Sequence, residues 1–307
     1  MTAFSKKYYR SLSPLVKAVD LARPLDWPAL FGRPAPLELE IGFGNGEYLH
    51  RVSQERPERD FVGVEIAWAS IKRALRRLAA PPRPNVRVMQ MKAETALERC
   101  FAPGSLAVIR SLFPIPWPDE RQERKRLFQR SFLDLAASRL APGGLFQLVT
   151  DSPELADWVM AQAAGSSLGL TLAERPAGLD TKYERKWQGG GRRVFFHLSG
   201  PKTGPVTVAA PREVTMQAYY SDQLNPETFS PEGCAGDMVV KFREFIYDRD
   251  RGQGLLRALV VEGPLTQDFY IRVSREGGRW KLSPAIASQL FPTQGVARAL
   301  ELAAAAR

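Results

Sequence analysis

The strongest constraint on the fold comes from one glycine-rich stretch, LELEIGFGNGEYL, at residues 37–49. An apolar strand predicted at Leu37–Ile41 leads into three alternating glycines, and a helical pattern follows at once. Glycines let a ligand approach the backbone closely, and the N–H groups in the first turn of a helix remain free to bind it. The stretch is therefore typical of a cofactor-binding turn in an α/β protein.

Two acidic residues frame this turn. Glu40 precedes the glycines, and Glu65 closes a second apolar run, FVGVEI. An acidic residue at the end of the second strand of such a sheet accepts hydrogen bonds from a ribose. The pattern predicts a nucleoside cofactor rather than a plain turn. The predicted cofactor-binding residues here are Glu40, Gly42, Gly44, Gly46 and Glu65.

Strands and helices alternate through the first two-thirds of the chain. After the first strand, we predict strands at Phe61–Ile66, Asn85–Met91, Leu106–Leu112 and Leu145–Thr150, with two closing strands at Thr171–Ala173 and Val194–Leu198. Helices are predicted at Gly46–Glu55, Ala67–Leu78 and Arg121–Leu140. This alternation favours an α/β, doubly wound Rossmann-like sheet, which binds ligands outside the carboxyl ends of its strands.

The pattern changes near the linker PKTGP at residues 201–205. Beyond it the chain reads as β-strands separated by glycine-containing turns, the first strand at Val214–Tyr220, and a helix at Val296–Ala306 ends the chain. We therefore expect a basic N-terminal arm at residues 1–36, a cofactor-binding domain at 37–200 and a smaller β-rich domain at 201–307. The arm is expected to lie outside the core.

Composition excludes several classes of protein. No apolar run approaches the roughly 20 residues of a membrane-spanning helix, and the basic N-terminus lacks the apolar region of a secretory signal. Two cysteines and two histidines, far apart in the sequence, argue against a zinc site and favour a reducing compartment. We expect a cytoplasmic protein without a metal, in which His50 and His197 are structural.

The charge of the chain is unevenly divided. Residues 1–200 contain 30 Lys and Arg against 21 Asp and Glu, whereas residues 201–307 contain 13 against 12. In the predicted helix Ala67–Leu78, one face carries Lys72, Arg73, Arg76 and Arg77. Such an excess suits either a polyanionic substrate or a solvated basic surface.

Several motifs in order resemble those of the bacterial tRNA (guanine-N7)-methyltransferases, which use S-adenosylmethionine on a class I methyltransferase fold. LEIGFGNGEYL and GVEIAWASIKRAL resemble the first two motifs of that family, and NVRVMQMKAETAL falls where the family contacts adenine. FPIPWPDERQERKRL, GGLFQLVTDSPELADW and DTKYERK resemble its later motifs. The resemblance covers roughly residues 37–200 and implies methyl transfer to a guanine of tRNA, in the variable loop.

The resemblance also implies roles for individual residues. Glu40 and the glycine turn would hold the methionine end of the cofactor, Glu65 its ribose, and Glu94 its adenine side. Substrate-binding residues would be Asp151 together with Thr181, Lys182, Tyr183 and Glu184, the last of which can instead pair with Lys182 or Arg185. DTKYERKWQGGGRR itself reads as a polar, glycine-rich loop.

The chain departs from the family pattern at the position of its catalytic aspartate, which is Ile115 here. Asp119 and Gln122 replace a Lys and a His of the basic tail, and Lys92 replaces an Asp beside the adenine, with Glu94 as a substitute. Asp119 is the candidate for the missing catalytic carboxylate, and its alternative role is to cap the following helix. Guanine N7 already carries a lone pair and loses no proton, so alignment of the reactants can supply most of the acceleration.

The residues around this loop have two interpretations each. Trp117 can stack on an unstacked guanine or pack internally. The cations Arg121, Arg124, Lys125 and Arg126 can contact phosphates or form a solvated face. Two alternative functions remain: an RNA- or cofactor-binding protein without catalysis, and a methyltransferase for another RNA or a small molecule.

Overall fold

The computed structural model describes residues 11–79, 81–176, 178–191, 194–285 and 290–306. The chain divides into two compact units, residues 1–210 and residues 211–307, and each is described by itself. In the part of the chain that the structure describes, no helix is long and apolar enough to span a membrane.

Unit 1 contains a sheet of seven strands in the order β3-β2-β1-β4-β5-β7-β6. The strands are β1 (Leu37–Ile41), β2 (Asp60–Glu65), β3 (Val86–Gln90), β4 (Leu106–Leu112), β5 (Leu140–Thr150), β6 (Thr171–Pro176) and β7 (Val194–Pro201). The first five are parallel, whereas β7 is antiparallel to both β5 and β6. This order confirms the predicted doubly wound, Rossmann-like fold.

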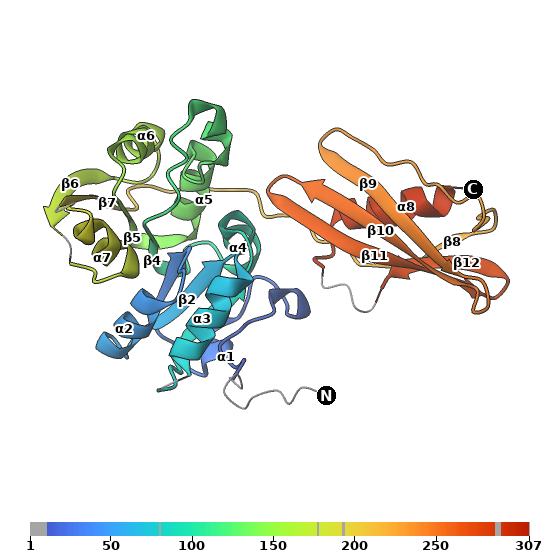
Figure 1. Cartoon of the computed structure of the whole chain (residues 1–307), viewed down its shortest axis with the longest axis horizontal. Coiled ribbons are helices and arrows are strands. Elements are labelled where there is room, and N and C mark those ends of the chain that lie inside the picture. Colours follow the sequence, from blue (N-terminus) through green and yellow to red (C-terminus); the bar gives the residue numbers. More distant parts are fainter. Residues whose placement is uncertain (1–10, 80, 177, 192–193, 286–289, 307) are drawn as a thin grey trace. The chain divides into compact units, whose positions relative to one another are not determined.

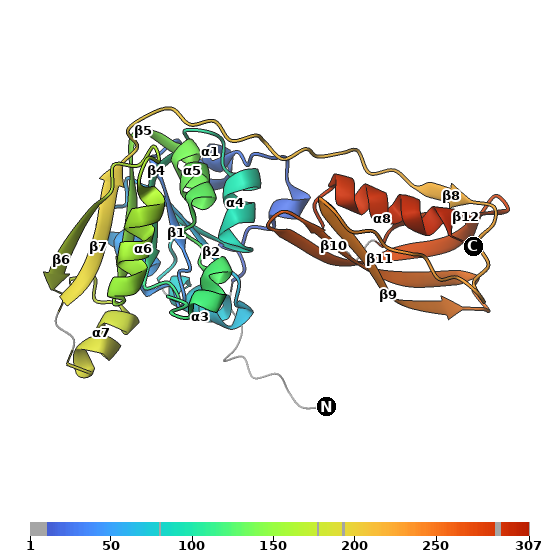
Figure 2. The same cartoon turned by 90° about the horizontal axis from the view of Figure 1, so that it is seen from above.

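Helices pack on the sheet in two groups (Figure 1, Figure 2). The first group, α2 (Glu47–Glu55) and α3 (Trp68–Leu78), packs together over β2 and β3. The second is a row formed by α4 (Ala93–Cys100), α5 (Arg130–Arg139) and α6 (Pro153–Ala163). The strand β1 between these groups is buried along its whole length, including Glu38, which pairs with Arg56, Arg59 and Arg110.

The long helix predicted at Arg121–Leu140 is wrong. A 3-10 helix, η3 (Glu120–Lys125), is followed by the separate helix α5, and residues 140–144 belong to β5. The stretch ERQERK has no apolar residue that could pack a helix on the sheet. Phe128, in contrast, is buried against Phe132 and Phe146. Residues 126–129 therefore separate the basic 3-10 helix η3 from α5.

Two further expectations need correction. The N-terminal segment contributes to the core, because Trp27 of α1 (Trp27–Phe31) is 4% exposed and stacks on Phe101. Residues 1–10 of the predicted arm lie outside the described residues. The predicted loop DTKYERKWQGGGRR contains a helix, α7 (Lys182–Gly189), in its described part. Its residues Thr181 and Glu184 form a capping box, which starts a helix.

Unit 2 is an antiparallel sheet with one helix, which confirms a smaller β-rich region. Its strand order is β8-β12-β11-β10-β9. The elements are β8 (Tyr219–Ser221), β9 (Met238–Asp248), β10 (Gln253–Glu262), β11 (Leu265–Glu276), β12 (Arg279–Pro284) and α8 (Gln294–Ala305). The helix α8 packs its buried side chains on one face of the sheet, with Val260, Ile271 and Leu282 in the shared core. The strand predicted at Val214–Tyr220 is reduced to β8.

Candidate active site

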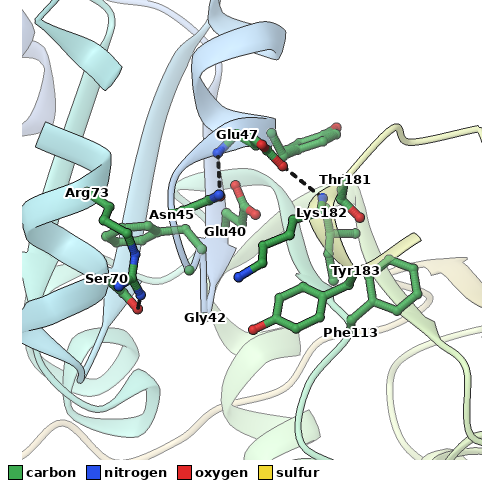
Figure 3. A pocket seen from close by; sticks show the side chains of 14 residues that line it. Glu40, Gly42, Asn45, Glu47, Ser70, Arg73, Phe113, Thr181, Lys182 and Tyr183 are labelled. Atoms are coloured by element: carbon green, nitrogen blue, oxygen red, sulfur yellow. Dashed lines mark hydrogen bonds between the residues drawn. The ribbon is translucent and has the colours of Figure 1, made fainter. Parts of the chain in front are cut away.

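A pocket opens at the carboxyl ends of β1 and β4, where the order of the parallel strands reverses (Figure 3). Such a switch point is the usual ligand site of an open α/β sheet. Four segments line it: the turn after β1 with the start of α2, helix α3, the end of β4, and the start of α7. Their lining residues include Glu40, Gly42, Gly44, Leu112, Phe113, Thr181, Lys182 and Tyr183. The structure thus brings together two groups of predicted site residues that are far apart in sequence.

Glu40 is the buried acid of this pocket. Its side chain is 4% exposed, and its Oε2 atom has no hydrogen-bond partner among the described residues. Burial raises the pKa of Glu40 to about 8, although Arg110 and Arg51 oppose the rise. A buried carboxyl oxygen without a partner is costly, so the site fits a ligand with a cationic donor, such as an ammonium group.

The backbone of the glycine turn leaves room for a ligand to approach closely. Gly42 and Gly44 have φ angles of 71° and 57°, a region that side chains disfavour, and open space lies above both Cα atoms. Gly46 serves packing instead, because a Cβ there would lie 2.7 Å from the Cβ of Ala74 in α3. The first two glycines leave room for a ligand, and the third lets α2 meet α3.

Glu65 holds the turn from the neighbouring strand. Its carboxylate accepts hydrogen bonds from the backbone N–H groups of Gly44 (3.2 Å), Ile66 (2.8 Å) and Ala67 (3.0 Å). The residue lies beside the turn, as the sequence predicts, but outside the lining of the pocket. These bonds fix the position of a half-buried acid at the carboxyl end of β2.

Helix α7 supplies the opposite wall. The Lys182 side chain and the Tyr183 ring extend from it toward Gly42, and the ring centroids of Tyr183 and Phe113 are 6.2 Å apart (Figure 3). Glu184 is fully buried and accepts hydrogen bonds from three backbone N–H groups, those of Gly178, Leu179 and Thr181. Its carboxylate therefore orders the segment before α7, and neither Lys182 nor Arg185 is its hydrogen-bond partner.

The loop after β4 has an unusual backbone. Phe113 and Trp117 adopt positive φ angles, 55° and 45°, which are rare for non-glycine residues. Ile115 between them is 67% exposed. Asp119 caps η3 through the N–H of Arg121 at 2.9 Å and also pairs with the Arg121 guanidinium. These bonds hold the pKa of Asp119 below its usual value.

The basic segment after this loop lies against aromatic rings. The Lys125 Nζ atom is 4.8 Å from the centroid of the Trp117 ring, and the Arg126 guanidinium lies 5.1 Å from that of Trp158. An open groove of about 570 Å³ runs beside them, lined by Arg121, Glu123, Arg124, Gln129, Trp158 and Gln162. Two of its cations thus face solvent beside the loop.

The remaining predicted residues surround the pocket without lining it. Asp151 follows β5, and no described residue donates a hydrogen bond to its carboxylate. Glu94 is half-buried in the first turn of α4, and Lys92 is the exposed residue at the start of that helix. His50 lies 3.2 Å from a guanidinium nitrogen of Arg83.

Eight lining residues are not among the predicted site residues: Phe43, Asn45, Glu47, Tyr48, Ser70, Arg73, Leu112 and Phe113. Glu47 and Tyr48 directly follow the glycine turn, so their proximity to it was a usable signal. Arg73 belongs to the basic face of α3, and its approach to the pocket depends on the packing of α3 against Gly46. No local pattern reveals that contact.

Comparison with known proteins identifies a matching family model and relatives of this chain. A family model described as "Putative methyltransferase" matches residues 34–197. A tRNA (guanine-N(7)-)-methyltransferase of Methylococcus capsulatus is 40% identical over 202 residues, covering 64% of this chain and 87% of that protein. The Thermotoga maritima protein of the same name is 31% identical over 271 residues, covering 84% and 85%. A crystal structure of the 16S rRNA methyltransferase KamB aligns with a TM-score of 0.47 at 17% identity, over 58% and 93%.

The alignment with the Thermotoga protein covers more of this chain than unit 1 contains. It therefore extends into unit 2. Part of the sequence of unit 2 is accordingly aligned with the Thermotoga protein.

Proposed function

The chain belongs to the family of tRNA (guanine-N7)-methyltransferases, and we propose that it transfers the methyl group of S-adenosylmethionine to N7 of a guanine in tRNA. One feature of the pocket supports this proposal independently of the family membership. The unpartnered Glu40 oxygen and the open glycine turn face residues 181–183 across one pocket. A cofactor site and a substrate-binding segment therefore share a single space.

The residues of the turn fit the cofactor. Glu40 would bind the ammonium of its methionine end, Gly42 and Gly44 give its backbone room, and Glu65 would bind the ribose, with Glu94 on the adenine side. When bound, S-adenosylmethionine supplies a methyl group on a sulfonium centre, which makes that carbon electrophilic.

The residues of the chain have only to position the guanine, because N7 attacks through an existing lone pair and loses no proton. A carboxylate would still help by holding the Watson–Crick edge of the base and offsetting the charge that develops on the ring. Asp119 can do this only when Arg121 releases its carboxylate. Asp151 needs no such release, and we assign it to binding of the substrate.

The basic segment is the proposed contact with the tRNA backbone. Arg121, Arg124 and Lys125 lie beside the loop, and Trp117 offers a ring at its edge. The target guanine is proposed to lie in the variable loop. Cytoplasmic location belongs to the same proposal.

The test is transfer of labelled methyl from S-adenosylmethionine to unmodified tRNA by the purified full chain, followed by mapping of the methylated nucleotide. We expect one 7-methylguanosine per tRNA, and Asp151→Ala to lose transfer while it keeps cofactor affinity. If none of the tRNAs tested is labelled, the result contradicts the proposal. Retained RNA or cofactor binding in that case would instead identify a binding protein, which the isoleucine at position 115 would explain.

A further inference from the structure

One carboxylate holds α7 in place, that of Glu47 in the first turn of α2. It accepts a hydrogen bond from the backbone N–H of Lys182 at 2.8 Å, the first residue of α7 (Figure 3). It also accepts two bonds from the Arg185 guanidinium, at 2.9 and 3.0 Å. Arg77 of α3 completes the cluster at 3.3 Å. Glu47 thus joins the helix after the glycine turn to the helix that covers the pocket.

The energetics favour this arrangement. Glu47 lies at the N-terminal end of α2 and receives the first free N–H of α7, so it faces the positive ends of two helix dipoles. Its side chain is 20% exposed, and two arginines neutralise it. Charge-assisted bonds of this kind are stronger than neutral ones, but partial exposure limits their net contribution.

The segment that Glu47 holds is ordered internally. Glu184 binds the amides of Gly178, Leu179 and Thr181, and Arg185 bonds to Asp180 at 2.8 Å. These bonds lie within residues 178–185. A second bond joins the segment to α2, because the Arg51 guanidinium donates to the Leu179 carbonyl. Residues 178–189 therefore move together only when the bonds from Glu47 and Arg51 open and Leu179 and Trp187 leave their packing beside Phe113.

The pocket beside the glycine turn is small while α7 is held against Glu47. With α7 against Glu47, the enclosed space beside the glycine turn is about 50 Å³. Small-molecule sites typically enclose about 300–1,000 Å³. The methionine end of the cofactor, the part assigned to this pocket, therefore has to displace Lys182 or Tyr183 as it enters.

We propose that Glu47 is a positioning residue that latches α7 over the cofactor pocket and thereby sets the rate of cofactor exchange. This inference rests on the proposed function, because it concerns S-adenosylmethionine. The latch is closed while methyl transfer takes place, and opening of its bonds admits fresh cofactor and releases the product.

The test is stopped-flow measurement of S-adenosylmethionine association and dissociation with the full chain in the absence of tRNA. Glu47→Ala is expected to raise both rate constants, the dissociation rate by roughly 10-fold, because charge-assisted bonds are lost. Arg185→Ala should act in the same direction without altering α2. The conservative variant Arg185→Lys, which keeps a cation that can reach Glu47, should retain slow exchange.

Asp134→Asn is the matched control, since Asp134 also pairs with an arginine at 2.9 Å but lies on α5. Its rate constants should equal those of the wild type. A slower or unchanged association rate in both Glu47→Ala and Arg185→Ala would overturn the latch while leaving the proposed function intact. Absence of S-adenosylmethionine binding by the wild type would instead overturn the proposed function.

Discussion

The turn after β1 and the loop after β4 meet at one pocket, but they are built differently. The turn places glycines at its positive φ angles, and Glu65 accepts a hydrogen bond from its Gly44 amide. The loop places Phe113 and Trp117 at positive φ angles and exposes Ile115 to solvent. Strain and an exposed apolar side chain are costs that a binding partner can offset. We therefore propose that the turn binds the cofactor, whereas the loop contacts RNA.

The largest effect expected from this comparison concerns Glu40. Glu40→Ala should weaken S-adenosylmethionine binding by roughly 100-fold, since removal of a buried charged partner costs about 3 kcal/mol. Isothermal calorimetry measures this loss, and tRNA affinity in a filter-binding assay should remain unchanged. Equal losses of cofactor and tRNA affinity would show that Glu40 does not serve the cofactor alone.

The raised pKa of Glu40 gives a second prediction. At pH 7 a carboxyl with a pKa of about 8 is largely protonated, and pairing with an ammonium group favours its ionised form. Binding of the cofactor should therefore release about 0.9 proton from Glu40. Calorimetry in buffers of different ionisation enthalpy measures this release, and Glu40→Gln should abolish that contribution.

The same group affects stability without a ligand. Its folded pKa of about 8 exceeds the ordinary value of 4.5, so the folded state keeps a proton that the unfolded state loses. Its contribution to stability is full below pH 4.5 and is lost as the pH rises through 8. Urea unfolding of wild type and Glu40→Gln between pH 5 and about 9 tests this sign. A difference between them that is independent of pH would contradict it.

A matched pair of glycines separates backbone strain from ligand approach. Gly44 and Gly104 both have positive φ angles and open space above the Cα atom. Alanine at either position should cost about 1–2 kcal/mol of unfolding free energy. Only Gly44→Ala should also weaken cofactor binding, by roughly 10-fold, because its Cβ enters the pocket. Equal cofactor affinity in the two variants would show that the turn does not touch the ligand.

The smallest effects concern the loop and its basic segment. Arg124→Ala should weaken tRNA binding and reduce the slope of affinity against salt by about 1.

Asp119→Ala should keep methylation activity within about 2-fold, because its carboxylate is held in an exposed pair with Arg121. A large loss in Asp119→Ala would identify it as the replacement for the family aspartate.

The sequence was most informative where local patterns determine structure. Alternating glycines predict the turn from adjacent residues, and the strand–turn–helix–strand spacing of the Rossmann-like pattern places Glu65, at the end of β2, beside it. The capping box of Thr181 and Glu184 is a helix signal in the sequence, but the polar, glycine-rich composition around it favours a loop. The contact of Glu47 with α7 joins residues 135 positions apart, so it depends on the packing of α7 and no local pattern reveals it.

The most direct test of this division of labour is one triple variant, Ile115→Ser, Asp119→Ala and Arg124→Ala. All three side chains lie in the loop or the basic segment. Calorimetry should give an S-adenosylmethionine affinity within about 2-fold of the wild type, while the kcat/KM for tRNA methylation falls by at least roughly 10-fold. A parallel loss of cofactor affinity would contradict the account, because the cofactor site would then depend on the loop.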